Sequence, residues 1–240
     1  RTHPVLGPAR LFILTLTAIA TAIFGVPALY GAATPSQQGA GLRSGVEELT
    51  RWLGGLEDQG PLGARLPAIK GSTGGRLELR EGMSALADKA KVADAGGVQA
   101  LADALEAITD SFPASDGDRT ISLSTDNVVA SGAIVGFDLA IHVERTEAKA
   151  PVDITAPAAG GLPQVDLTTA KTEGLPLKST FDGTFKVRYD SDRNYFFIER
   201  SDSTPALAAA SKVTDGSIPA GTKAAIGFGD VNVADGSSIA

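Results

Sequence analysis

The chain has 240 residues, of which 43% are hydrophobic, and this is enough for one large or two modest domains with a real core. It contains no cysteine, which excludes a disulfide scaffold, a thiol nucleophile and a zinc site with cysteine ligands. Its formal net charge of −7 repels nucleic acid and anionic lipid, so nucleic acid is not an expected partner.

Residues 1–33 have the three-part plan of an export signal. A basic stretch over 1–10 precedes an apolar run over 11–24, and Pro27 then interrupts the helix before small residues at 31–33. We expect a signal peptide that is cleaved after Ala33 or, as the next choice, after Ala28. The alternative is a retained membrane anchor, because the apolar run extended to Ala33 is long enough to span a bilayer.

Both interpretations of this segment make the export machinery a partner of residues 1–33 and place the rest of the chain outside the cytoplasm. The chain begins with Arg1 instead of Met, so we expect it to be a fragment of a larger bacterial protein. We expect truncation at the other end as well, because the final residues resemble the start of a further strand.

Residues 34–41 form a linker in our interpretation, and residues 42–112 form a helical segment. Three stripes of apolar residues at intervals of three and four predict three short amphipathic helices. The stripes are Leu42, Val46, Leu49, Leu53 and Leu56; Leu79, Met83, Leu86 and Ala90; and Val98, Leu101, Leu105 and Ile108. Such helices cannot bury their faces alone, so they must pack together or on a sheet. We expect Trp52 to pack at the edge of the first stripe rather than to form a ligand platform.

Residues 113–240 change to the period-two alternation of β-strands. The longest alternating run places on one face Val135, Phe137, Leu139, Ile141 and Val143. Residues 181–200 read as an alternating strand, a polar turn and an aromatic strand, which predicts a β-hairpin. Further strands are expected at 165–167, 206–213 and 224–233, with a loop or irregular edge over 147–163.

No helical pattern separates these strands, so we predict a mainly antiparallel meander in an α+β fold. The order along the chain is an export or anchor helix, short amphipathic helices and then the sheet. The helices at 42–112 are the candidates within this chain to cover the apolar face of the sheet, and a second sheet from a missing C-terminal portion is the other.

The two histidines give little support for catalysis. His3 lies in the export segment, so a Ser-His-Asp triad or a histidine-ligated metal would depend on His142 alone, and a surface strand residue is the simpler interpretation. Asp138 and Glu144 share a strand face with His142, but at ~20 Å apart they cannot act as a carboxylate pair in glycoside hydrolysis. We therefore predict no catalytic residue and no cofactor.

The segment that contains Asp190, Asp192 and Asn194 opens like a calcium-binding loop, with the pattern D-x-D-x-N. The rest of the pattern fails, because Tyr195 stands where the loop needs glycine and Ser201 where it needs a bidentate glutamate. A polar hairpin turn is the favoured interpretation, and calcium ligation by these three residues stays as the alternative.

Several stretches in sequence order resemble a known class of protein. These are a leucine-rich helical spacer followed by GFDLAIHVERT, GLPLKSTFDGTFKVRYD, FFIE and GFGDVNVADGS. Together they are similar to the repeated β-rich modules of very large bacterial exported proteins of the adhesin and hemagglutinin-like kind. The resemblance covers about residues 45–240 and implies an extended surface or secreted protein whose modules act as stalk or binding units.

We expect a non-enzymatic exported module with a scaffold or adhesion role and an extracellular protein, glycan or lipid partner. One alternative is a lipid- or glycan-binding domain that uses the apolar side of the sheet, and it requires a cavity between helices and sheet. The other is a secreted hydrolase, which requires a cleft with clustered carboxylates near His142.

Overall fold

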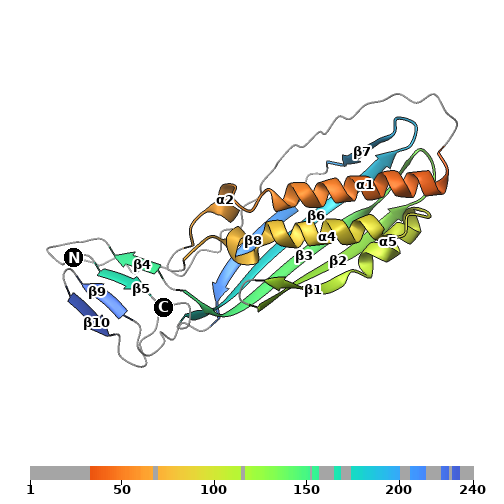
Figure 1. The fold of residues 1–240 in the computed structure, drawn as a ribbon. Coiled ribbons are helices and arrows are strands. Elements are labelled where there is room, and N and C mark those ends of the chain that lie inside the picture. The colour runs from red at the N-terminus through yellow and green to blue at the C-terminus, as the bar shows by residue number, and fades with distance from the viewer. Residues whose placement is uncertain are drawn as a thin grey trace.

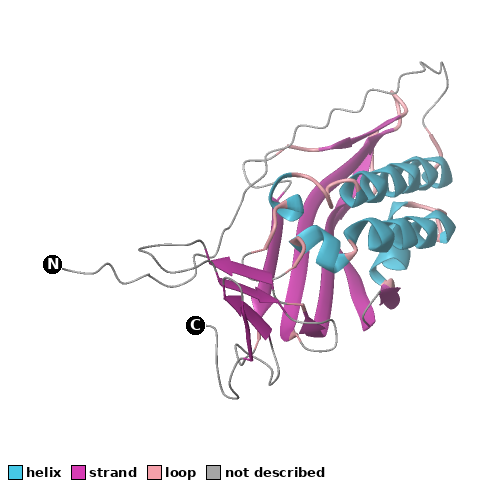
Figure 2. Ribbon diagram, turned by 60° about the vertical axis from the view of Figure 1, so that its left-hand side comes forward, coloured by secondary structure: helices cyan, strands magenta, loops and turns pink. Residues whose placement is uncertain are grey.

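The computed structural model describes residues 33–66, 70–114, 117–151, 153–156, 165–168, 174–200, 206–214, 223–226 and 229–232. Within these ranges the chain has the predicted α+β fold, with a layer of helices on one face of an antiparallel sheet (Figures 1 and 2). The expectations for the export segment and for the C-terminal end fall outside the described residues. No helix within the described ranges has both the length and the apolar character needed to cross a membrane.

The helical layer consists of α1 (Pro35–Gly54), α2 (Gly60–Gly63), α3 (Thr73–Leu77), α4 (Leu79–Val92) and α5 (Val98–Glu106). The first predicted stripe falls on α1 and the residues just after it, the second on α4, and the third on α5 and the residues just after it. Every residue of the stripes except Ile108 is buried. Gly54 lies beside Arg80 at the start of α4, and Arg43 bonds Ala93 just after its end, so α1 and α4 run antiparallel.

The prediction of a linker at 34–41 is wrong, because α1 already begins at Pro35. Thr34 is the N-cap: its side chain accepts a hydrogen bond from the backbone of Gln37, whose side chain accepts one from the backbone of Thr34. This capping box, with proline at the first helical position, is a helix start signal. The Pro/Ser/Gln/Gly composition of the segment concealed it, since polar and glycine residues at 36–41 lack an apolar stripe.

The main sheet contains β1 (Thr109–Ala114), β2 (Gly117–Val129), β3 (Ile134–Ala150), β6 (Leu175–Asp190), β7 (Tyr195–Ile198) and β8 (Ala206–Val213). Its order is β1-β2-β3-β6-β7. The long strand β6 pairs with β7 along residues 187–190 and with β8 along residues 177–184, so β7 and β8 follow one another along the same edge of β6. All pairs are antiparallel, and the predicted hairpin over 181–200 is confirmed as β6 and β7. This arrangement confirms the mainly antiparallel sheet.

A second, smaller sheet has the order β10-β9-β5-β4 and also pairs antiparallel. Its strands are β4 (Asp153–Ala156), β5 (Val165–Thr168), β9 (Lys223–Ile226) and β10 (Gly229–Asn232). In Figure 1 it lies beyond the end of the main sheet that is opposite the start of α1.

Three sequence-based expectations change with this second sheet. The segment 147–163, predicted as a loop or irregular edge, contains the end of β3 and the whole of β4, and β4 is an edge strand of the small sheet. The strand predicted at 165–167 is confirmed as β5, but it pairs with β4 and β9 in the small sheet instead of joining a single meander. The single strand predicted at 224–233 is two strands, β9 and β10, that pair with each other.

The core fills the space between the helices and the main sheet. The predicted inward residues of β3 and those of β6, including Phe181 and Phe185, are almost fully buried and belong to one cluster with the stripes of α1, α4 and α5. Trp52 is partly buried and packs at the edge of this cluster, as expected. The sheet therefore presents one face to the helices, and none of the described helices covers the other, which we call the open face.

Candidate functional site

The open face carries a row of polar residues from adjacent strands. The strand register places Ser122 of β2 opposite His142 of β3, and His142 opposite Asp182 of β6. Because alternate residues of a strand point to the same face, these three side chains lie side by side away from the core. The sequence predicted the orientation of His142, but not its neighbours on β2 and β6.

Charged groups surround the imidazole of His142. Its Nδ1 lies 2.7 Å from Asp182 Oδ1, and its Nε2 lies 3.6 Å from Glu144 Oε2. Lys178 Nζ lies 2.8 Å from the same Glu144 oxygen. The hydrogen bond from Lys178 is the largest influence on the Glu144 carboxyl group and, with the neighbouring His142, holds its pKa below the ordinary value despite partial burial.

A half-open hollow of about 130 Å³ adjoins this group. Ser122, Ser124, Ala140, His142, Asp182 and Thr184 contribute to its lining, so it combines hydroxyl groups with one imidazole and one carboxylate. The small side chain of Ala140, which stands between Ser124 and Thr184 in the strand register, leaves room for the hollow. Its size suits a few water molecules or one small polar group of a larger ligand.

Among the described residues, the groups around His142 do not have the arrangement of a hydrolytic triad. Asp182 on Nδ1 is the orientation that a catalytic histidine needs, but Nε2 faces Glu144 rather than a hydroxyl group. The backbone N–H groups of β2, β3 and β6 pair within the sheet at this level, so these strands offer no oxyanion hole. The geometry fits binding through hydrogen bonds better than nucleophilic catalysis.

Asp138 lies on the same face but in a separate group. It accepts hydrogen bonds from Arg188 at 2.9 Å and from Asn127 at 2.8 Å, and Arg188 also contacts Glu199. Burial raises the pKa of Asp138, but the two hydrogen bonds and the charge of Arg188 outweigh it and lower the pKa overall. Asp138 and Glu144 therefore belong to different clusters, which agrees with the expectation that they do not act as a pair.

The D-x-D-x-N segment forms the turn between β6 and β7. Asp190 is buried, and its Oδ1 accepts hydrogen bonds from the backbone N–H groups of Asp192 and Arg193 while its Oδ2 pairs with the side chain of Arg193. Asn194 has a left-handed φ of 52° and accepts a hydrogen bond from the hydroxyl of Tyr189. The carboxylate of Asp190 is thus engaged within the turn, which fits the polar-turn interpretation.

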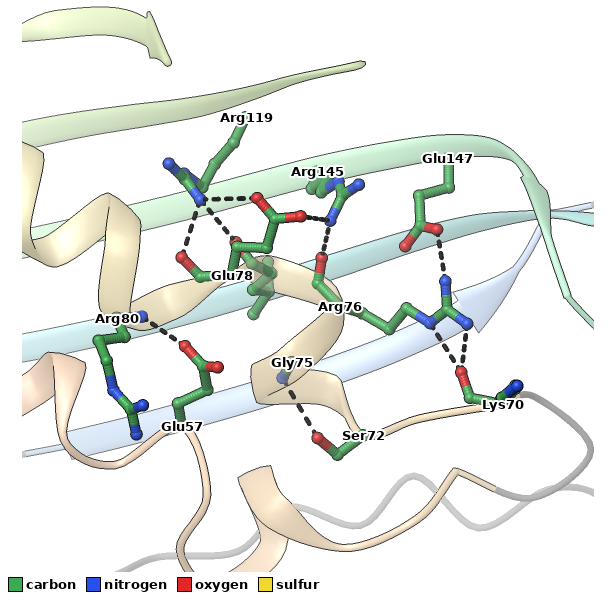
Figure 3. Close-up of polar contacts among 11 residues, drawn as sticks. Glu57, Lys70, Ser72, Gly75, Arg76, Glu78, Arg80, Arg119, Arg145 and Glu147 are labelled. Carbon is green, nitrogen blue, oxygen red and sulfur yellow. Dashed lines mark hydrogen bonds and ion pairs between the residues drawn. The ribbon is translucent and has the colours of Figure 1, made fainter. Parts of the chain in front are cut away.

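A buried group of charges lies on the opposite side of the main sheet, where the apolar face ends (Figure 3). We call Arg76, Glu78, Arg119, Arg145 and Glu147 the arginine cluster. Arg119 and Arg145 stand opposite each other on β2 and β3, at inward positions in line with the apolar residues, and both are almost fully buried.

The arginine cluster holds the elbow between α3 and α4. Glu78 at this elbow has a left-handed φ of 47°, and the carbonyl groups at the end of α3 have no further helical turn to bond. Arg145 donates to the carbonyl of Arg76 at 2.5 Å and to Glu78 Oε1 at 3.1 Å, while Arg119 donates to the carbonyl of Glu78 at 2.8 Å. The sheet thus supplies the donors that the elbow needs.

Arg76 extends the cluster toward Glu147, whose side chain is 2% exposed. Arg76 donates to Glu147 Oε2 at 2.7 Å and to the carbonyl of Lys70, which fixes the chain before α3. Burial lowers the pKa of the Arg119 guanidinium, against the opposing charges of Glu81 and Glu78. Sequence reasoning missed this cluster, although charged residues in line with Ile121 and Val143 were a visible interruption of the apolar alternation.

The fold and the open face together define a two-layer α+β protein with a packed core and a polar sheet surface. Comparison of the chain with protein-family models, with curated proteins and with solved structures finds no match.

Proposed function

We propose that the chain is a non-enzymatic exported module of a larger bacterial surface or secreted protein, in which the helix-backed sheet is a scaffold with a role in adhesion. We further propose that the open face around His142 is the surface that meets an extracellular partner. The export segment at 1–33 and the resemblance to adhesin-like modules motivate the cellular setting.

The observation that carries this proposal is the contrast between the two faces of the main sheet. The apolar face packs against the helices with Phe137, Phe181 and Leu139 almost fully buried. The open face carries hydroxyl, carboxylate, imidazole and ammonium groups in register across three strands. A rigid sheet with one free polar face suits recognition through many weak hydrogen bonds, as in a surface module.

The described residues bear differently on the two alternative functions. A lipid- or glycan-binding domain of the type we considered needs access to the apolar side of the sheet, which the helices cover. A hydrolase needs an activated nucleophile, and Nε2 of His142 faces a carboxylate. A hydrolase would nevertheless have its carboxylates in the right place, since Asp182 and Glu144 both flank His142.

The export part of the proposal is tested by expressing the chain with a start codon in a bacterial host, followed by fractionation and mass determination of the N-terminus. A product outside the cytoplasm, either starting near Thr34 or retaining residues 1–33 in the membrane, is the expected result. Retention in the cytosol would overturn the export proposal.

The non-enzymatic part is tested with chromogenic ester and glycoside substrates on the purified chain and its His142→Ala variant. We expect no turnover above the uncatalysed rate in either protein. Turnover that disappears in His142→Ala, but persists in the matched Ser124→Ala variant of the same face, would establish the hydrolase alternative instead.

A further inference from the structure

Three large hydrophobic residues are exposed in the described part of the chain, and they lie at the same end of the molecule. Val92 is 82% exposed, Ile134 is 47% exposed and Val129 is 40% exposed. Val92 ends α4, whereas Val129 and Ile134 bracket the turn between β2 and β3. A single exposed aliphatic residue is ordinary on a protein surface, but their gathering at one end calls for an explanation.

Hydrogen bonds attach both segments to the beginning of α1. Gln38 Nε2 in the first turns of α1 donates to the carbonyl of Gly132 at 3.3 Å, and Arg43 donates to the carbonyl of Ala93 at 3.4 Å. The β2–β3 turn is also held by Ser191, whose N–H and hydroxyl both donate to the carbonyl of Ala133. Figure 1 shows the start of α1 and the β2–β3 turn at the same, right-hand end of the ribbon.

The start of α1 leads directly back to the apolar run at 11–33. Thr34 is the N-cap of α1, so no linker separates the folded protein from this run. One extended residue spans only about 3.3–3.6 Å. If residues 11–33 remain in a bilayer, this end of the protein is therefore held against the bilayer surface.

We propose that the end of the protein formed by Val92, Val129 and Ile134 rests on the lipid surface in which residues 11–33 are anchored. This inference rests on the proposed export of the chain, in the form in which the segment is retained. Apolar side chains next to an anchor gain free energy by entering the interface between headgroups and acyl chains.

The charges around this end define the kind of lipid surface. The segment 127–137 carries no charged residue, which permits its turn to enter the interface. Nearby, Lys91 and Asp94 flank Val92 along the chain, and Asp192 and Arg193 lie in the turn that includes Ser191. Because these charges are mixed and the whole chain is acidic, the contact does not depend on anionic lipid, and zwitterionic phosphatidylcholine is the appropriate surface.

The absence of cysteine from the chain allows a direct test with single labels. We would prepare Val92→Cys, Val129→Cys and Ile134→Cys in the full chain, attach an environment-sensitive fluorophore, and reconstitute each protein into phosphatidylcholine vesicles. The control is Lys212→Cys on β8, which is exposed and pairs with Lys178. Ile134 pairs with Asp190, so along β6 the control lies ~40 Å away. Thermal unfolding of each labelled variant confirms that it is folded, and the exposed sites make this outcome expected.

The expected result is that labels at 92, 129 and 134 are quenched several-fold more strongly by quenchers on lipid chains than the label at 212, and less by iodide in water. Equal iodide quenching at all four sites, in protein that floats with the vesicles, would overturn the lipid contact and leave the anchor intact. Failure to float with vesicles would overturn both the anchor and the contact. Protection of the labels from both quenchers would also overturn the lipid contact, and would indicate that protein covers this end.

Discussion

Gly45 of α1 lies directly against the ring of Phe196 in β7, so that a β-carbon at Gly45 would come within 2.0 Å of Phe196 Cδ2. One turn earlier, a β-carbon at Gly41 would come within 2.4 Å of the ring of Tyr189. Two glycines four residues apart thus allow the helix to approach the hairpin closely, because they lie on one face of α1. The position of α1 therefore depends on Gly41 and Gly45, which are not part of its apolar stripe.

We expect Gly45→Ala to destabilise the protein by about 1–3 kcal/mol, because the new methyl group overlaps the Phe196 ring. The sign of the change in unfolding free energy is informative, because a Gly-to-Ala change inside an unobstructed helix stabilises a protein by about 1 kcal/mol. Urea unfolding followed by circular dichroism measures the difference. The exposed Ser44→Ala variant is the control and should be neutral or slightly stabilising.

A double-mutant cycle with Phe196→Ala isolates the contact itself. In the Phe196→Ala background the added methyl group has room, so Gly45→Ala should cost much less there than in the wild-type chain. An equal cost in both backgrounds would show that the ring is not the obstacle.

The arginine cluster supports a second prediction, on the elbow between α3 and α4. Replacing the buried Arg145 by Met should lower the free energy of unfolding by about 3 kcal/mol, because the partly buried carbonyl of Arg76 and one oxygen of Glu78 each lose a donor. The same change at Arg51, which is 52% exposed and pairs with Glu47 and Glu48 on the surface of α1, should cost at most about 0.5 kcal/mol. Similar losses for the two variants in urea unfolding would contradict the role assigned to the cluster.

A third prediction concerns the capping box at the start of α1. Thr34→Ala removes the acceptor for the backbone N–H of Gln37 and should cost about 1 kcal/mol. Thr34→Ser keeps the hydroxyl oxygen and should recover most of that loss. Hydrogen exchange of the first amides of α1 is the sharper measurement, because loss of a cap frays the adjacent turn first. Unchanged protection in Thr34→Ala would argue that packing alone fixes this end of the helix.

Much of the fold was predictable because it follows from short-range patterns. The stripes that include Leu42, Leu86 and Leu101, and the alternation that includes Phe137, marked the buried faces correctly. The start of α1 was missed because its signal is a cap at Thr34, which has no apolar periodicity. Local capping chemistry must therefore be weighed against the composition of a segment.

The functional surface was less accessible to sequence reasoning, because it depends on pairing between distant strands. His142 meets Asp182, which stands 40 positions later in the chain, only through the register of β3 and β6. The partners of Arg119 were hidden for a similar reason, since they lie at a helix elbow rather than on a strand. The side chains that meet around His142 and in the arginine cluster are thus brought together by contacts between distant parts of the chain.

The final prediction concerns acid stability and Asp138. Hydrogen bonds from Asn127 and Arg188 lower the pKa of this carboxyl group below its ordinary value of 3.8, although burial acts in the opposite direction. A group whose pKa is lower in the folded than in the unfolded state contributes stability that is complete above the unfolded value. The contribution is lost as the pH falls through the folded value. We therefore expect wild type to be more stable than Asp138→Asn at about pH 6, and the difference to shrink below about pH 3.8.

Urea unfolding at a series of pH values measures this difference. Asn127→Gly is the matched variant, because glycine tolerates the left-handed φ of 51° at this position and the change removes one donor while the Asp138 carboxyl group and its pair with Arg188 stay in place. The loss of unfolding free energy in this variant, relative to wild type, should be smaller than the loss in Asp138→Asn and should narrow over the same pH range. Some loss of stability in acid should persist in Asp138→Asn, because the pKa of Glu144 is also lowered. A difference between wild type and Asp138→Asn that stays constant from neutral to acidic pH would show that the carboxylate charge contributes nothing to the folded state.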